Sequence, residues 1–127
     1  MPRAKRARKA SRKKGISFAT VRRLAFALPG VEDGLSYGTP ALKVRGKFLT
    51  RLREEDHSIV LILGSIEERD FLLQADPKVF FITEHYRNYP DVLVRLDTVR
   101  LSLVRELLEQ AWRRIAPRRL VSAFDAA

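Results

Sequence analysis

The chain has 127 residues, of which 46% are hydrophobic and 31% charged, and its formal net charge is +10. This length and composition are typical of one folded globular domain and exclude a wholly disordered chain. The absence of cysteine excludes disulfides, thiolate metal sites and a cysteine nucleophile, and the longest aliphatic run, Ile59 to Leu63, is too short to span a membrane.

The first segment of the chain, residues 1–14, is strongly basic and contains no acid. Its eight cations are Arg3, Lys5, Arg6, Arg8, Lys9, Arg12, Lys13 and Lys14. Like charges repel one another and no apolar side chain larger than alanine follows Met1, so we predict a disordered basic tail over residues 1–15. The folded domain is predicted over residues 16–127. That remainder carries 17 cations against 15 acids, so the tail supplies most of the attraction to polyanions.

The first element of the domain is predicted to be a helix from Ser17, its N-cap, to about Leu28. Apolar residues recur there at helical spacing, and Pro29-Gly30 then ends the helix. The segment from Val31 to Pro40 is rich in glycine, proline and other turn formers, and we predict that strands begin only after it. Gly38 is expected to adopt backbone angles that other residues avoid.

A basic hairpin is predicted from Ala41 to Arg53, where the hydrophobic period changes to two and Arg45-Gly46 supplies a turn. We expect one face of this hairpin to pack on the core through Leu42, Val44, Phe48 and Leu52. The opposite face would show Leu49 and a stripe of cations. This stripe consists of Lys43, Arg45, Lys47, Arg51 and Arg53.

The second half of the chain is predicted to alternate strands and helices. Ser58 to Leu63 reads as a central strand buried on both faces. Ser65 and Glu68 form a capping box for a short helix that ends at Asp76-Pro77. Two further strands follow, Val79 to Thr83 and Val92 to Leu96, joined by a loop from Glu84 to Asp91.

The last predicted element is a helix from about Leu103 to Ile115, capped by Ser102 and ended by Pro117. Most links between the predicted strands are too short for parallel crossovers. The predicted fold class is therefore α+β, with an antiparallel sheet and the N- and C-terminal helices packed on one of its faces.

Several linked stretches of this sequence resemble the MmcQ/YjbR family. They are residues 27–32 (ALPGVE), 36–40 (SYGTP), 43–48 (KVRGKF), 83–90 (TEHYRNYP), 111–112 (AW) and 116–117 (AP). The resemblance covers nearly all of Phe18 to Leu120. It implies a compact CyaY-like fold in which strand hairpins project as a double wing, and a DNA-binding role inferred from that shape. It implies no enzyme activity, and it does not account for the basic tail.

These observations favour nucleic acid as the partner, with DNA as the preferred kind. Phosphates attract the eight tail cations and the hairpin stripe, and arginine or aromatic side chains on a hairpin enter a groove or stack on bases. If all eight tail cations paired with duplex phosphates, the slope of log K against log salt would be near −7, from about 0.9 per contact. The alternative interpretation of the hairpin cations is a solvated strand face that discourages pairing with another strand. The alternative for the tail cations is a role in solubility.

The loop around residues 85–89 is the second candidate site. It places His85, Tyr86, Arg87 and Tyr89 within a few residues of one another. We assign Arg87 to the nucleic-acid contacts and treat His85, Tyr86 and Tyr89 as a ligand or partner loop. The alternative is structural, with both tyrosine rings packed against the sheet and their hydroxyls at its rim. A non-enzymatic module that binds a protein or a small ligand is therefore the second functional hypothesis.

Catalytic, metal and cofactor sites are not predicted. His57 and His85 lie far apart, without partners at ligand spacing, and no hydrolase, metalloprotease or phosphate-loop motif occurs in the sequence. We expect neither a metal nor a cofactor, no enzyme activity and no membrane partner. The expected location is the cytoplasm, at the nucleoid if DNA is bound.

Overall fold

The structure of the chain is a computed structural model, which describes residues 15–127. Residues 1–14 of the predicted disordered tail, with all eight of its cations, lie outside the described residues. The described chain joins the sheet at Ile16, whose N–H donates to the carbonyl of Leu96 at 2.8 Å.

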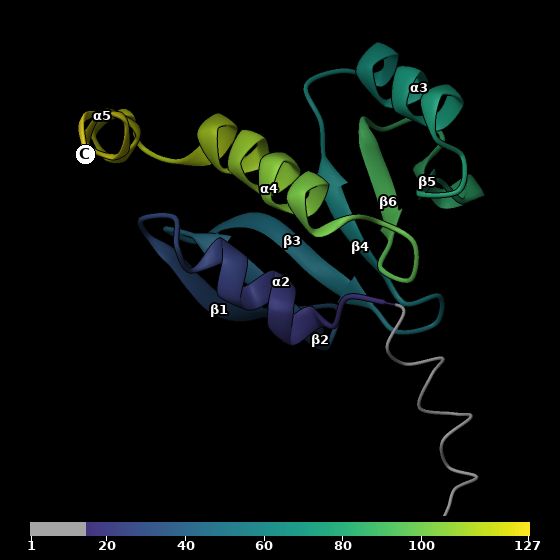
Figure 1. The fold of residues 1–127 in the computed structure, drawn as a ribbon, viewed down its shortest axis with the longest axis horizontal. Coiled ribbons are helices and arrows are strands. Elements are labelled where there is room, and N and C mark those ends of the chain that lie inside the picture. The colour runs from purple at the N-terminus through teal and green to yellow at the C-terminus, as the bar shows by residue number, and fades with distance from the viewer. Residues whose placement is uncertain (1–14) are drawn as a thin grey trace, which may run out of the picture.

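Six strands form one antiparallel sheet in the order β1-β2-β3-β4-β6-β5. They are β1 (Val31–Ser36), β2 (Thr39–Val44), β3 (Lys47–Arg53), β4 (Ser58–Ile62), β5 (Phe80–Phe81) and β6 (Asp91–Arg95). The helices are α2 (Phe18–Ala25), α3 (Ile66–Ala75), α4 (Leu101–Ile115) and α5 (Arg118–Ala126), with a 3-10 helix η1 (Glu84–Tyr86). Figure 1 shows α2 and α4 side by side across one face of the sheet. The predicted α+β class and this placement of the terminal helices are confirmed.

The predicted starts of two helices are confirmed by their caps. Ser17 Oγ accepts from the N–H of Thr20 at 3.2 Å, and Ser65 Oγ accepts from the N–H of Glu68 at 3.0 Å. The helix α2 ends at Ala25 because the chain then tightens into turns, in which the N–H of Leu28 donates to the carbonyl of Ala25. The helix α4 begins two residues before its predicted start. Ser102 therefore lies in its first turn, and Arg100 is the N-cap.

Two tight turns connect the first three strands. In each turn, Tyr37-Gly38 and Arg45-Gly46, both central residues have positive φ angles: 53° and 77° in the first, 50° and 84° in the second. This is the type I′ geometry that joins two antiparallel strands without an added loop. The predicted turn at Arg45-Gly46 and the special backbone angle of Gly38 are confirmed.

Two elements were not predicted, apart from the short 3-10 helix η1 in the segment predicted as a loop. The strand β1 occupies part of the segment assigned to turns, because pairing of Val31 to Ser36 with β2 outweighs the low strand propensity of Glu32, Asp33 and Gly34. The helix α5 follows Pro117 directly, because the fixed φ of proline suits a helix start as well as a helix end.

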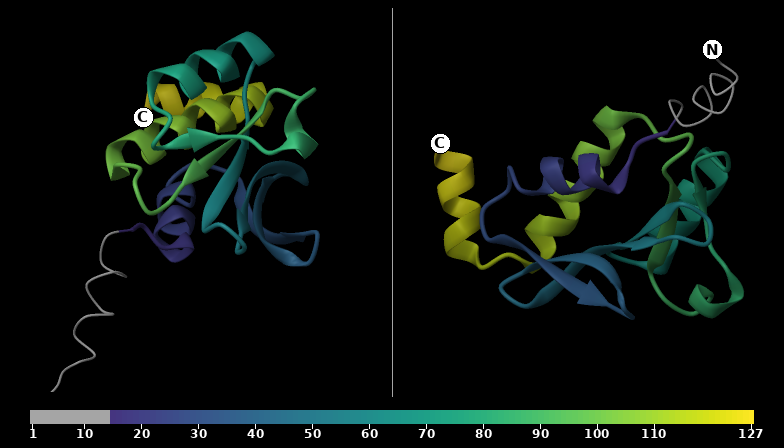
Figure 2. Two further views of the ribbon diagram at one scale, coloured as in Figure 1. Left: turned by 90° about the vertical axis from the view of Figure 1, so that its right-hand side faces the viewer. Right: turned by 90° about the horizontal axis from the view of Figure 1, so that it is seen from below.

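The main core lies between the sheet and the helices. Val21, Leu42, Ile59 and Leu108 are fully or almost fully buried there, and Trp112 is 0% exposed. A smaller apolar cluster of Val60, Tyr86 and Leu93 lies on the other face of the sheet, which we call the open face. Figure 2 shows this face turned away from α2 and α4.

A β-bulge corrects the predicted pattern of the hairpin. Leu42 pairs with Thr50 but Lys43 pairs with Phe48, so Leu49 is an extra residue on β3. Leu49 consequently packs into the main core, whereas Phe48 packs against the cluster on the open face. The expected positions of these two side chains are thus exchanged.

Candidate nucleic-acid interface

Cations from three strands lie on the open face. Directly opposed residues of an antiparallel pair share a face, so the register fixes which side chains meet there. Lys43 lies opposite Phe48, Arg51 opposite Val60, and Arg53 opposite Ser58, which in turn lies opposite Arg95. Three cations of the predicted stripe therefore share the open face, where they are joined by Arg95 of β6.

The other two cations of the stripe lie elsewhere. Arg45 is a turn residue, and its side chain lies beside Gly30, at the base of α5. Lys47 pairs with Val44, so it leaves the sheet on the side that the helices cover. The expectation that all five cations share one face is wrong, because the two-residue turn and the bulge both interrupt the alternation.

The open-face cations differ in how freely they can meet a ligand. Arg53 is neutralised by Asp56 at 2.9 Å and Glu55 at 3.4 Å. Arg95 stacks on the ring of Phe81 at 4.0 Å, and Lys43 extends across the bare backbone of Gly34. Within residues 15–127, Lys43, Arg51 and Arg95 form no ion pair. These three are the cations of this face that are free to bind an anion.

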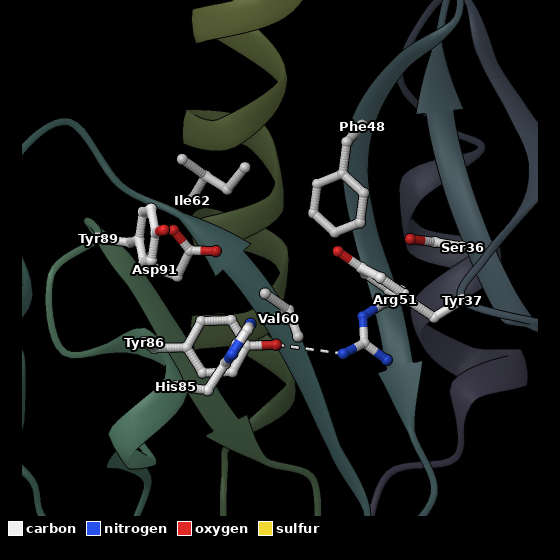
Figure 3. Close-up of a pocket in the computed structure, with 10 residues that line it drawn as sticks. All are labelled: Ser36, Tyr37, Phe48, Arg51, Val60, Ile62, His85, Tyr86, Tyr89 and Asp91. Atoms are coloured by element: carbon white, nitrogen blue, oxygen red, sulfur yellow. Dashed lines mark hydrogen bonds between the residues drawn. The ribbon is translucent and has the colours of Figure 1, made fainter.

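A pocket of about 420 Å³ lies in the middle of the open face. Its lining comes from β1, the β1–β2 turn, β3, β4, η1, the loop after η1 and β6: Ser36, Tyr37, Phe48, Arg51, Val60, Ile62, His85, Tyr86, Tyr89 and Asp91. Figure 3 shows Arg51 and Asp91 on opposite walls, with Val60 and Ile62 between them. The pocket therefore combines an apolar floor with opposite charges at its two sides, and its volume falls in the range of small-ligand sites.

The fold brings the two candidate sites of the sequence together in this pocket. Arg51 of the stripe donates through Nη2 to the hydroxyl of Tyr86 at 3.1 Å, and its guanidinium lies 5.1 Å from the centre of the Tyr37 ring. Tyr86 is buried, as the structural reading predicts, whereas Tyr89 is 55% exposed. His85 is exposed and meets Tyr86 edge-on at 4.8 Å. Arg87 points into solvent, paired with Glu84 at 2.8 Å.

A buried arginine that the sequence analysis did not single out holds the pocket loop. Arg69 on α3 is 5% exposed, and its Nη1 donates to the carbonyls of Tyr86, Arg87 and Tyr89 at 3.1, 3.0 and 2.7 Å. Its Nε and Nη2 donate to Asp70. One side chain therefore binds three carbonyl groups of the loop that carries His85, Tyr86 and Tyr89, and so fixes the shape of the pocket wall.

Asp91 is the acidic group of the pocket. In the described part of the chain its carboxylate accepts no hydrogen bond and forms no ion pair. Burial raises the pKa of Asp91, and the charges of His85 and Arg69 oppose this effect. A partly buried carboxylate without a protein partner lowers the stability of the fold in its ionised form.

Replacing this carboxylate by an amide is expected to stabilise the protein at neutral pH. Because the folded-state pKa of Asp91 is raised, the folded chain binds more protons than the unfolded chain just above about pH 4, and stability falls as pH rises through that window. Asp91→Asn should remove this loss and leave a flatter pH profile. Urea unfolding of both proteins at a series of acidic pH values measures the free energy of unfolding. Equal dependence of this free energy on pH in the two proteins would contradict the expectation.

Residues 15–127 contain neither a metal-binding cluster nor a membrane-spanning helix. None of the groupings of histidine, aspartate and glutamate there has the three members that a metal ion needs. His57 instead bonds through Nδ1 to Asp97 at 2.7 Å. Among residues 15–127, no helix has both the length and the apolar composition required to cross a bilayer.

Comparison with known proteins gives a consistent result. A family model described as YjbR matches residues 26–114. Uncharacterized protein Rv2570 of Mycobacterium tuberculosis and Uncharacterized protein Mb2600 of Mycobacterium bovis are each 41% identical to this chain over 95 residues, covering 72% of this chain and 74% of the relative. The crystal structure of Deinococcus radiodurans protein DR2400, with the family-model domain DUF419, superposes with a TM-score of 0.65 at 20% identity over 78% of each chain. That last likeness shows a shared fold.

Proposed function

Starting from the fact that this chain belongs to the YjbR family, we propose that it binds nucleic acid, DNA first, through the open face of its sheet. The observation that carries the proposal is the mixture of side chains on that face. Lys43, Arg51 and Arg95 lie there beside the rings of Phe48, Phe81 and Tyr86. Cations bind phosphates and aromatic rings stack on unpaired bases, so this combination suits a single nucleic-acid strand in an extended conformation.

The basic tail is proposed to add phosphate contacts from a neighbouring position. The described chain begins at Gly15, which lies against Leu96 and Asp97 at the end of β6. Arg95 and Arg53 lie close to the same end of the sheet. The residue to which the tail is joined, Gly15, therefore lies near the end of the sheet that carries Arg95, and two linked groups of contacts bind one polyanion more tightly than either group alone. The proposed activity is binding without catalysis, at the nucleoid.

Removing two free cations from the open face tests the proposal. In the full chain, Lys43→Ala combined with Arg95→Ala should reduce the slope of log K against log salt for single-stranded DNA by about 1.4, since each phosphate contact on a single strand contributes about 0.7. Fluorescence anisotropy of a labelled oligonucleotide over a range of salt concentrations measures the slope.

A charge-matched control separates the open face from net charge. Arg23 and Arg105 are exposed on α2 and α4, on the helical side, and neither forms an ion pair in the part of the chain that is described. Arg23→Ala combined with Arg105→Ala removes the same charge and should leave the slope unchanged. If both double variants shift the slope equally, attraction follows net charge and the open face is not the binding surface.

The second candidate function is the binding of a small ligand or protein partner at the pocket loop. It is favoured by the volume of the pocket and by the unpartnered carboxylate of Asp91. Replacing all eight tail cations by glutamine in the full chain distinguishes the two hypotheses. Polyanion affinity should fall steeply under the first, whereas ligand or partner binding should survive under the second.

A further inference from the structure

The strongest unexplained feature of the molecule is the arrangement of opposite charges around the pocket. Asp91 stands on one wall without a partner, and Arg51 stands on the other, oriented by Tyr86 and Tyr37 (Figure 3). The register places Arg51 opposite Val60 and Asp91 opposite Ile62. Their Cα atoms are therefore about 12 Å apart, since they are two strands apart and two residues out of step. A ligand that meets both groups must have a hydrogen-bond donor at one end and an anion at the other.

We propose that this pocket binds an unpaired guanine nucleotide, with the guanine edge on Asp91 and the phosphate toward Arg51. This inference rests on the proposed function and names the base that the open face selects. Its first step is the chemistry of an ionised carboxylate, which has two oxygens that accept hydrogen bonds and cannot donate. Guanine is the common base whose edge presents two adjacent N–H donors, at N1 and at the exocyclic N2. Each of the other common bases presents only one donor group on its Watson–Crick edge.

The rest of the pocket suits the body of a nucleotide. Phe48 and Ile62 offer an apolar surface, and the ring of Tyr89, which is 55% exposed, lies beside Asp91 (Figure 3). Aromatic rings on an uncovered sheet are a common platform for unpaired bases. The volume of about 420 Å³ admits a purine with its sugar, and a cationic ligand would meet Arg51. The site is open to solvent on one side, so it accepts a base from within a strand as well as a free nucleotide.

The sharpest test compares two ligands that differ by a single amine. Hypoxanthine is guanine without the N2 amine, so it retains the shape, the charge and the N1 donor. We expect the full chain to bind a thymine oligonucleotide with one central guanine about tenfold more tightly than the same strand with hypoxanthine, the size of one hydrogen bond to a charged group. Free GMP should exceed free IMP by a similar factor. Anisotropy and titration calorimetry provide the two measurements.

Two variants connect this preference to Asp91. Asp91→Asn should bring the guanine and hypoxanthine strands to equal affinity, because the amide replaces one acceptor with a donor. Glu84→Gln is the matched control: Glu84 belongs to the same loop and pairs with Arg87, outside the pocket lining. It should keep the preference. The comparison of ligands uses the unmodified protein, so a folding defect in a variant cannot decide the outcome.

The possible results separate this inference from the proposed function. Strand binding without a guanine preference would overturn the inference and leave nucleic-acid binding intact. A preference for GMP over IMP without strand binding would support the pocket as a free-nucleotide site and overturn the proposed strand function. If neither strands nor nucleotides bind, both proposals fail.

Discussion

Replacing Trp112 by alanine is expected to destabilise the protein by about 4 kcal/mol, the usual loss for a buried tryptophan. Trp112 is the only tryptophan of the chain and is 0% exposed. Its Nε1 donates to the carbonyl of Pro29 at 2.8 Å, and its ring meets that of Phe124 edge-on at 5.1 Å. The substitution therefore opens a cavity under α4, leaves the Pro29 carbonyl without this donor, and removes the contact that holds α5.

Circular dichroism during urea unfolding is the appropriate measurement, because the variant lacks the intrinsic fluorophore. Trp112→Phe retains most of the ring volume but not the N–H, so it should cost about 2 kcal/mol. Arg118→Ala, at an exposed position of α5, should change stability by less than about 0.5 kcal/mol. A loss below about 1 kcal/mol for the alanine variant would show that this junction is not a main source of stability.

Replacing Arg69 by methionine is expected to cost about 3 kcal/mol and to release the pocket loop. Methionine matches much of the aliphatic stem, but it leaves three carbonyls without the donor that now serves them. Amide hydrogen exchange gives the local measurement. The N–H groups of Tyr86, Arg87 and Tyr89 are bonded within the loop and should lose protection well beyond the change expected from global stability.

Two further substitutions set the scale for this effect. Arg69→Lys retains the charge but not the planar fork, so it should restore only part of the protection. Asp70 binds the other nitrogens of Arg69 but has a side chain that is 52% exposed, and Asp70→Asn should have a small effect. Unchanged exchange in the methionine variant would mean that the loop keeps its shape through its own turns.

The parts of the fold that the sequence predicts well are those coded by local chemistry. Ser17 and Ser65 act as N-caps because each presents a hydroxyl to the N–H three residues later. Arg45-Gly46 forms a turn because glycine tolerates positive φ. Such signals need no knowledge of the partner strand or helix.

The parts that the sequence misses depend on distant partners. The strand β1 exists through its pairing with β2, and the bulge that exchanges Phe48 with Leu49 is a property of two strands together. The two-residue turn and the bulge each shift the alternation by one residue, so a strict alternation assigns Lys47, Phe48 and Leu49 to the wrong faces. The two shifts cancel after Leu49, and Arg51 and Arg53 therefore lie on the open face, where the alternation placed them.

The candidate site was foreseen as two separate pieces. The basic hairpin and the tyrosine loop lie more than 30 residues apart, and only the order β3-β4-β6 brings Arg51 to Tyr86. Arg95 carries a weak signal, since it alternates with Val94 on a predicted strand, whereas Asp91 was assigned to the loop before that strand. Arg69 carries none: in the sequence it resembles any polar residue of a short helix, and its burial follows from the position of the loop.

The two outer strands of the sheet bear on how the protein behaves at high concentration. Free strand edges readily accept another chain, which leads to domain swapping or aggregation. Here β5 is only two residues long, and β1 carries Glu32, Asp33 and Gly34, with Asp33 held by Arg22 at 2.6 Å. Both edges are thus poor templates for a foreign strand. The protein can expose a broad, partly aromatic sheet surface in a crowded cell without polymerising along it.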